Sequence, residues 1–187
     1  MPTTNPDMQS HEELQQHVTS YLQNKGWKVV NTGYHDYLNE TDTKYIAKNY
    51  SPSSLLYRTQ PDLFCCNANE AFYVDLKTNN GPHENLAVEL LPLLASAMKD
   101  KLFNSTTYYI FLDKGINRRT VKEIRIVTAT ELLDSVAILF LDDRMEKIIT
   151  SYPEMNNIKK KPYIKGDSFA VIPFDKVNCF KLLEEVL

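Results

Sequence analysis

Two aspartates and a lysine, Asp62, Asp75 and Lys77, stand close enough in the sequence to form one chemical site. The residues around them read as a β-hairpin, because two runs of β-favouring residues, 63–66 and 71–77, flank a polar turn that contains asparagine. Side chains alternate between the two faces of a strand, so Asp75 and Lys77 should share one face of the return strand. Asp62 begins the partner strand, and a short hairpin can bring it next to Asp75.

Two neighbouring carboxylates repel each other unless a positive charge lies between them. Mg²⁺ takes oxygen ligands and is usually held by one or two carboxylates with water and phosphate, so Asp62 and Asp75 are candidate metal ligands. Lys77 would then face the phosphate or the attacking water, which is the arrangement needed for metal-assisted hydrolysis of a phosphodiester. The alternative interpretation is a solvent-exposed hairpin in which Asp75 and Lys77 form a surface ion pair.

Pro61-Asp62 followed by Asp75-Leu76-Lys77 resembles the PD-(D/E)xK signature of the restriction-endonuclease-like nucleases. That superfamily includes type II restriction enzymes, Holliday-junction resolvases and phage exonucleases. The resemblance implies an α/β fold with an αβββαβ core, in which helices flank a mixed central sheet and a further strand and helix follow at the C-terminus. It also implies a divalent-metal-dependent nuclease that hydrolyses phosphodiester bonds, with DNA as the expected nucleic acid.

The resemblance also gives each residue of the signature a role. Asp62 and Asp75 would bind Mg²⁺, with Mn²⁺ as a substitute and the backbone carbonyl of Leu76 as a further ligand. Lys77 would orient or activate the water and stabilise charge that develops on the phosphate. Members of the superfamily often carry a glutamate on the first helix that helps to hold the metal through water, and Glu13 and Glu12 are the candidates here. The alternative function is a non-catalytic module on the same fold that binds nucleic acid or a protein partner.

The first helix is expected to run from Ser10 to about Asn24, after a flexible arm over residues 1–9. Ser10 and Glu13 have the spacing of a capping box, which is the alternative role for this glutamate. Gly26 is expected to end the helix, and a strand should follow directly.

Residues 31–60 read as a long polar insertion in which tyrosines alternate with cations. This composition suits base stacking and phosphate contact, but it equally suits a segment whose tyrosines pack against the protein, and packing is the favoured interpretation. The cations expected to contact nucleic acid, in this segment and in a basic turn over residues 115–122, are Lys44, Lys48, Arg58, Arg118 and Arg119.

The rest of the chain is expected to alternate helices and strands. A helix from His83 to Lys101 should be kinked by Pro92, which lies inside its apolar pattern. Glu89 on this helix has two alternatives, projection toward the aspartates or a place at the surface, and the surface is the favoured one. The strand that follows this helix should pair in parallel with the return strand of the hairpin. The expected later elements are strands over 106–112, 123–128 and 169–173 and helices over 130–140 and 175–187.

Length and composition predict one globular domain over residues 1–187, since 43% of the 187 residues are hydrophobic. The sequence has neither an apolar run that could span a membrane nor a signal-peptide core. Three cysteines without disulfide-framework or zinc-site spacing predict a reduced, cytoplasmic protein. The net charge of −3 argues against non-specific coating of nucleic acid but allows a nuclease with local basic patches. The oligomeric state, a homodimer included, stays open.

Overall fold

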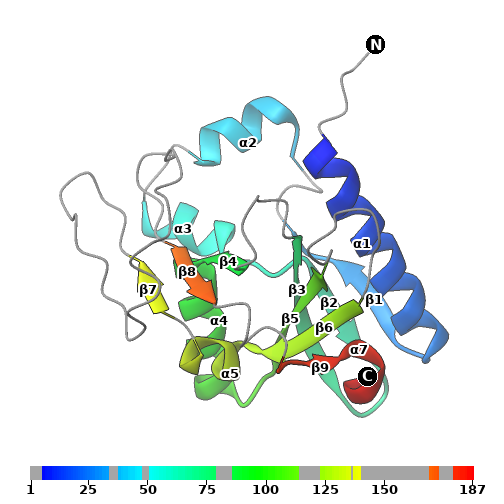
Figure 1. Cartoon of the computed structure of the whole chain (residues 1–187). Helices are drawn as coiled ribbons and strands as arrows, with labels where there is room; N and C mark the ends of the chain where they lie inside the picture. The colour runs from blue at the N-terminus through cyan, green and yellow to red at the C-terminus, as the bar shows by residue number, and fades with distance from the viewer. Residues whose placement is uncertain are drawn as a thin grey trace.

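The computed structural model describes residues 6–33, 38–47, 51–78, 86–113, 123–135, 137–139, 169–172 and 179–187 (Figure 1). These residues form a six-stranded sheet in the order β1-β2-β3-β5-β6-β9 and a three-stranded sheet in the order β4-β8-β7. In chain order the elements are α1 (Pro6–Asn24), β1 (Lys28–Asn31), α2 (Glu40–Ala47), α3 (Pro52–Arg58), β2 (Leu63–Cys66), β3 (Ala71–Thr78), β4 (Leu86–Glu89), α4 (Leu90–Phe103), β5 (Thr107–Asp113), β6 (Glu123–Thr128), α5 (Ala129–Asp134), β7 (Ala137–Leu139), β8 (Phe169–Ile172), β9 (Lys181–Leu182) and α7 (Leu183–Val186).

The larger sheet is mixed. β1, β2 and β3 pair antiparallel, β3 and β5 pair in parallel, and β6 and β9 continue antiparallel. The helix α4 lies in the connection between the two parallel strands. The order α1, β1, β2, β3, α4, β5 is the predicted αβββαβ core, with α2, α3 and β4 inserted, so the predicted fold class is confirmed.

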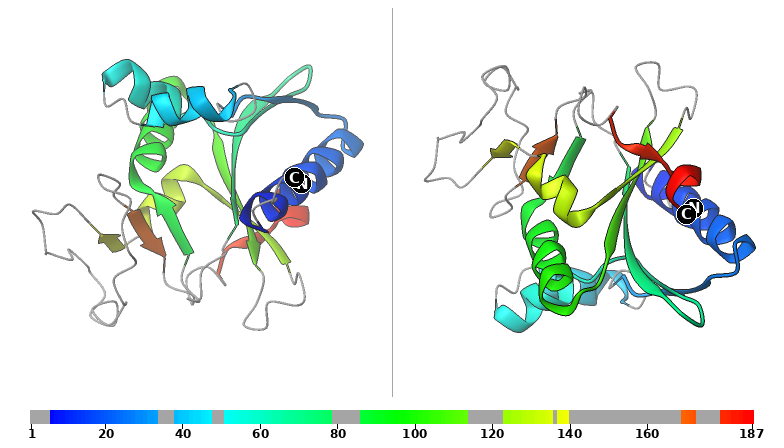
Figure 2. Two further views of the ribbon diagram at one scale, coloured as in Figure 1. Left: turned by 90° about the horizontal axis from the view of Figure 1, so that it is seen from above. Right: turned by 90° about the horizontal axis from the view of Figure 1, so that it is seen from below.

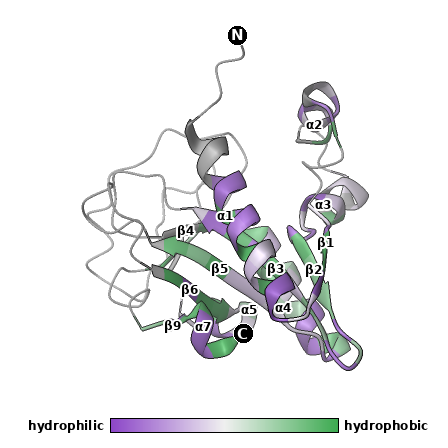
Figure 3. Ribbon diagram, turned by 90° about the vertical axis from the view of Figure 1, so that its right-hand side faces the viewer, coloured by the Kyte–Doolittle hydropathy of each residue, from purple (hydrophilic) through white to green (hydrophobic). Residues whose placement is uncertain are grey.

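Helices cover both faces of the larger sheet (Figure 2). On one face α1 buries Leu14, Val18 and Leu22 in a cluster with apolar residues of β2, β3 and β5. On the other face α4 and α5 pack around Tyr109 and Phe111 of β5. Figure 3 shows the resulting hydropathy, with hydrophobic strands inside and the hydrophilic side of α1 turned outward.

The strand β3 lies in the interior of this sheet and serves both faces. Phe72, Val74 and Leu76 belong to the apolar cluster beneath α1. Because side chains alternate along a strand, Asp75 and Lys77 project from the opposite face, toward α4. The fold therefore places the predicted acid and lysine between the sheet and a helix rather than on an exposed hairpin surface.

The hairpin that joins β2 to β3 forms as the sequence predicts. Its register pairs Leu63 with Val74 and Cys66 with Ala71. Asn67 shapes the turn, because its side-chain oxygen accepts hydrogen bonds from the backbone N–H groups of residues 69 and 70 at 2.8 and 2.9 Å. Such side-chain to backbone bonds are the reason that asparagine favours turns.

The predicted start of the first helix is wrong. The helix begins at Pro6, so Ser10 lies inside it and does not cap it, and residues 6–9 are not part of an arm. A proline at the first helical position loses nothing, since the N–H group that it lacks would have no partner there. The end of the helix is close to the prediction, and Gly26 follows it with a positive φ of 91°.

The connection from β1 to β2 is also more ordered than its polar composition indicates, because it contains α2 and α3. Asn39 precedes α2, and its side-chain oxygen accepts a hydrogen bond from the backbone N–H of Asp42 at 2.9 Å. Ser54 of α3 donates from its hydroxyl to the carbonyl of Ile46 at 3.1 Å, which ties the two helices together. Local capping and this tie stabilise helices that hydropathy alone does not reveal.

Three predicted helices have different bounds. In place of a helix over 83–101, the chain forms β4 and then α4, so Pro92 falls in the first turn, where its missing N–H costs no hydrogen bond, and no kink is required. In place of 130–140 it forms the shorter α5, capped by Thr128 and Glu131, followed by β7. Of the helix predicted over 175–187, residues 175–178 lie outside the described residues, 181–182 pair with β6 as β9, and 183–186 form the helix α7.

Three further predicted strands are present in the structure. The strands predicted over 106–112, 123–128 and 169–173 are confirmed within one or two residues as β5, β6 and β8. The three cysteines are free thiols. Among the described residues there is no helix of the length and apolar character that crossing a membrane requires.

Candidate active site

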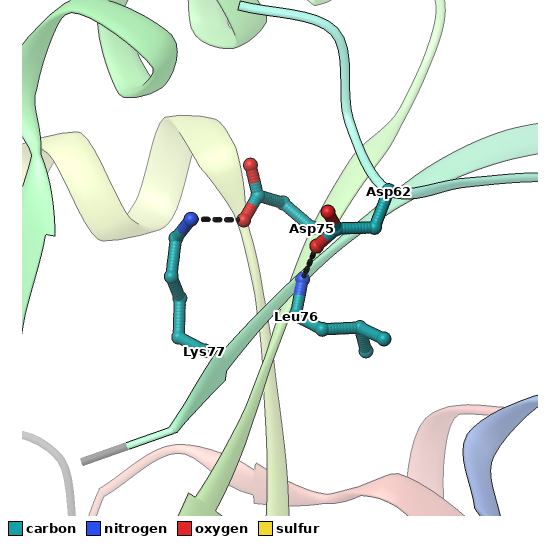
Figure 4. Close-up of polar contacts among 4 residues, drawn as sticks. All are labelled: Asp62, Asp75, Leu76 and Lys77. Carbon is teal, nitrogen blue, oxygen red and sulfur yellow. Dashed lines mark hydrogen bonds and ion pairs between the residues drawn. The ribbon is translucent and has the colours of Figure 1, made fainter. Parts of the chain in front are cut away.

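Asp62 is held beside β3 by backbone hydrogen bonds. The pairing of Leu63 with Val74 is the last of the β2–β3 ladder, and one step further along the register Asp62 stands opposite Asp75. The Asp62 Oδ2 accepts a hydrogen bond from the backbone N–H of Leu76 at 2.7 Å, so a carboxylate continues the ladder where the β2 backbone leaves it (Figure 4). The backbone carbonyl of Asp62 accepts from Thr32 at 2.7 Å, which fixes the residue from the other side.

Asp75 and Lys77 form an ion pair on the same face of β3, with 2.6 Å between Lys77 Nζ and Asp75 Oδ1 (Figure 4). The Asp75 side chain is only 6% exposed, whereas the Lys77 side chain is 24% exposed. The surface-hairpin interpretation, in which both charges are solvated, is therefore wrong. A buried carboxylate with a partly accessible lysine is costly to desolvate, which marks this pair as a candidate for function.

The charge of Lys77 is protected by its surroundings. Burial by itself would lower the pKa of Lys77, but the carboxylates of Asp75 and Asp62 outweigh it and raise the pKa above its ordinary value. Lys77 is therefore a cation throughout the neutral range, in reach of both aspartates. The charge of Lys77 in turn favours the ionised form of Asp75, with which it forms the ion pair.

Two further residues, which the sequence analysis did not assign to the site, act on it from neighbouring elements. Tyr109 lies beside Asp75 in the parallel pairing of β3 with β5, and its ring centroid is 6.0 Å from Lys77 Nζ. Burial first, and then the charge of Asp75, raise the pKa of Tyr109 well above its ordinary value, so its phenol stays neutral. Glu89, at the start of α4, is exposed as expected, but its charge also acts on the pKa of Lys77 and of Tyr109.

A third residue outside the signature, Lys99 of α4, lies on the same side of β3. Its Nζ stands 3.5 Å from the centroid of the Tyr73 ring. The sequence contains a signal for Tyr73 and Tyr109. Tyr73 is two residues from Asp75 on the same strand and therefore faces the same side, and a parallel pairing of the two strands places Tyr109 beside Asp75. Lys99 gave no such signal, because its place depends on how α4 packs.

The structure does not bring Glu13 to this pair. Glu13 is exposed on α1, whose buried residues contact the opposite face of the sheet, and the described residues hold no group of three or more acidic, histidine or cysteine side chains that could share a metal. A contribution of Glu13 through water stays a prediction, as does that of the Leu76 carbonyl. The two aspartates are the ligand pair that remains.

Of the cations predicted to contact nucleic acid, Lys44 is exposed on α2 and Arg58 is half-buried at the end of α3. Neither belongs to the contacts described around Asp75. The favoured packing of the tyrosines is wrong for Tyr45, which is 77% exposed, whereas Tyr57, which is 39% exposed, is more than half covered. The other cations of that prediction, which lie outside the described residues, are Lys48, Arg118 and Arg119.

The donor set at the pair fits a hard divalent cation. Asp62 and Asp75 offer carboxylate oxygens from adjacent strands, and the only cation with which Asp75 forms an ion pair in the described chain is Lys77. Mg²⁺ is commonly bound through one or two carboxylates, with water and substrate phosphate in the other positions. The pair could therefore hold Mg²⁺ or Mn²⁺ together with a phosphate.

The chain matches no known sequence family, but solved structures with a similar fold exist. The sequence matches no protein-family model and no curated protein. The structure is similar to that of Hjc, a Holliday junction resolvase from the archaeal hyperthermophile Archaeoglobus fulgidus, with 8% identity, a TM-score of 0.49 and coverage of 95% of this chain and 94% of that chain. It is also similar to a nuclease from a fusselovirus, with 13% identity, a TM-score of 0.45 and coverage of 100% and 91%. The roles of the side chains have to be argued from the site itself.

Proposed function

We propose that this protein is a divalent-metal-dependent nuclease that hydrolyses phosphodiester bonds in DNA. The observation that supports it is the meeting of Asp62, Asp75 and Lys77 on the α4 side of β3, with the Asp75 carboxylate almost fully buried. A sheet that needs only stability would place apolar side chains there, as β3 does on its other face. A buried acid with an adjacent lysine therefore requires a chemical explanation.

Each residue has a distinct task in this proposal. Asp62 and Asp75 would hold Mg²⁺, which when bound neutralises the charge of the phosphate and lowers the pKa of a coordinated water. The hydrogen bond from the Leu76 N–H fixes the Asp62 carboxylate in orientation, so one oxygen is committed to the protein. Lys77 is charged and close to Asp75, from where its ammonium group would orient the attacking water and stabilise negative charge that develops on the phosphate.

The test is cleavage of supercoiled plasmid, linear duplex, single-stranded DNA and RNA, each with Mg²⁺, with Mn²⁺ and with a chelator. The wild type should cut at least one DNA substrate with metal and none with chelator. Asp75→Asn removes the charge of a site ligand with little change in shape and should abolish cutting. Asp134→Asn, an exposed aspartate on α5, is the matched control and should cut like the wild type.

Two results would contradict the proposal. Cutting by the Asp75→Asn protein at the wild-type rate would remove the aspartate pair from the chemistry. A wild type that binds DNA but cuts no substrate with either metal would favour the non-catalytic binding module instead.

A further inference from the structure

Lys99 and Tyr73 form a cationic position beside the aspartate pair. Lys99 Nζ lies 3.5 Å from the centroid of the Tyr73 ring, a close cation–π contact. Tyr73 is held in turn by the ring of Phe64, directly opposite on β2, with 5.2 Å between the centroids. The lysine is thus positioned by an aromatic pair on two paired strands rather than left mobile on the helix surface.

The charge of Lys99 has no ion-pair partner in the described part of the chain. The carboxylate of its neighbour Asp100 is engaged elsewhere, since it accepts hydrogen bonds from the Thr107 backbone N–H at 2.7 Å and from the Ser105 hydroxyl at 2.9 Å. Burial lowers the pKa of Lys99, and the charges of Asp100 and Asp75 oppose that effect only in part. A half-buried ammonium without a counter-ion gains from an anion that comes to it.

The position of Tyr73 says where that anion would lie. Tyr73 and Asp75 are two residues apart on one face of β3, a separation of about 6.8 Å along a strand. Along the axis of a duplex the phosphates of one strand advance about 3.4 Å per nucleotide, and consecutive phosphates lie further apart than this rise because the backbone winds around the axis, so the distance corresponds to one or two nucleotides. A nucleic-acid backbone that follows β3 past the aspartates would bring a second phosphate to Lys99.

We propose that Lys99, supported by Tyr73, binds a backbone phosphate one or two nucleotides from the bond that is cut. This inference rests on the proposed function, because it uses the same strand path. It divides the work of the two lysines. Lys77 is paired with Asp75 and acts on the reacting phosphate, whereas Lys99 binds a phosphate that does not react. Loss of Lys99 should therefore weaken binding without slowing the chemical step of bound substrate.

The experiment measures the affinity for a short DNA duplex and a single strand by fluorescence anisotropy, with Ca²⁺ in place of Mg²⁺, over a series of salt concentrations. Lys99→Met keeps the aliphatic contact with the Tyr73 ring but removes the charge. It should weaken binding several-fold and reduce the slope of log K against log salt by about 0.9 for the duplex or about 0.7 for the single strand, the value of one phosphate contact. Lys99→Arg should restore the slope.

Lys101→Met is the matched control, because Lys101 is exposed on the same helix, and it should leave the slope unchanged. Single-turnover cleavage at saturating protein should proceed within about 3-fold of the wild-type rate in Lys99→Met, in contrast to loss of Lys77. A Lys99→Met slope equal to that of the wild type would overturn the inference even if the wild type cuts DNA. If the wild type cuts no DNA but Lys99→Met still lowers the slope, Lys99 binds a phosphate and the protein is not a nuclease.

Discussion

On the α1 side of β3, Val74 and Leu76 are almost fully buried and belong to an apolar cluster. On the α4 side of the same strand, Asp75 is just as buried but carries a charge, and Lys77 and Tyr73 beside it are partly accessible. Residues from the two sets alternate along β3, so the backbone and the neighbouring strands are common to both. The two sets differ in the helix that covers them, which is α1 on one face and α4 on the other.

The difference shows how the fold accommodates an unfavourable site. Burying a carboxylate and half-burying two lysines opposes folding, and the ion pair returns only part of that free energy. The apolar cluster under α1 fixes β2, β3 and β5 from behind, so the α4 side of these strands can hold charges in place. Stability and chemistry are thus divided between two faces of one sheet, and this division can be tested by experiment.

The two faces should differ most in the reactivity of Cys65 and Cys66, which are adjacent on β2. Burial on the α1 side, and then the neighbouring Cys66, raise the pKa of Cys65 to about 12. At pH 8 only about one Cys65 in 10⁴ is then a thiolate, so iodoacetamide should alkylate it about 10³-fold more slowly than a free cysteine. Cys66, half-buried on the other face, should react faster than Cys65.

Single-cysteine proteins measure this contrast by mass spectrometry. Cys66→Ser with Cys179→Ser leaves only Cys65, and Cys65→Ala with Cys179→Ser leaves only Cys66. As a control that the reagent is active, the Cys65 protein should be alkylated fully once it is unfolded in guanidinium. Equal rates in the two folded proteins would show that β2 does not alternate as described.

The next largest effect concerns Lys77. Its charge should matter most when negative charge develops on the phosphate, so Lys77→Ala should lower the single-turnover rate about 10²-fold or more, with little change in DNA affinity measured in Ca²⁺. Lys77→Arg should not restore the rate fully, because a planar guanidinium is larger and does not give up a proton.

Folding has to be checked in the same experiment. Asp75 is buried, and Lys77→Ala leaves its carboxylate without the ion pair, so the variant should melt below the wild type, more so with chelator than with Mg²⁺. Rates are compared at a temperature where both proteins are folded. A folded Lys77→Ala protein that cuts at the wild-type rate would refute the assignment of Asp75-Leu76-Lys77.

The sequence was sufficient to predict most of the sheet and the shared face of Asp75 and Lys77, for identifiable physical reasons. The hairpin was visible because β-favouring residues surround Asn67, and the apolar residues at 72, 74 and 76 determine which face Asp75 takes. The parallel pairing of β5 with β3 followed from strand, helix, strand connectivity. These features depend on periodicity over one or two neighbouring elements.

The parts that could not be predicted depend on contacts between distant segments. The ends of α5 and α7 are set where β7 and β9 pair with other strands, and no local signal marks such ends. Pro92 read as a kink because the preceding β4 continues the apolar run of α4. Lys99 was missed since its contact with Tyr73 exists only after α4 docks on the sheet. Glu13 was chosen by resemblance, and the packing of α1 does not bring it to the aspartates.

The apolar face can be weakened directly at Val74. This residue lies between Tyr73 and Asp75 in the sequence, but its side chain is fully buried on the opposite face, in the cluster with α1. Val74→Ala removes two methyl groups from a packed core and should lower the free energy of unfolding by about 2 kcal/mol, as measured by urea denaturation. The cleavage rate of the folded variant should change less than about 3-fold. Leu102→Ala, at a position that is 72% exposed, is the control and should leave stability nearly unchanged. If folded Val74→Ala protein cuts far more slowly than the wild type, beyond about 3-fold, the two faces are not independent.

The smallest effect on stability is expected far from both faces, at Tyr45 of α2. Its side chain is 77% exposed, so Tyr45→Ala should alter the free energy of unfolding by less than about 0.5 kcal/mol. If Tyr45 stacks on a base, the same change should weaken DNA binding by about 1–3 kcal/mol, since every base offers a face on which an aromatic ring can stack. Leu56→Ala on α3, 64% exposed and without a ring, separates stacking from the mere loss of surface area. Equal affinity in the wild type and in Tyr45→Ala would exclude Tyr45 from the DNA-binding surface, whereas a large fall in melting temperature would contradict the exposed position of its side chain.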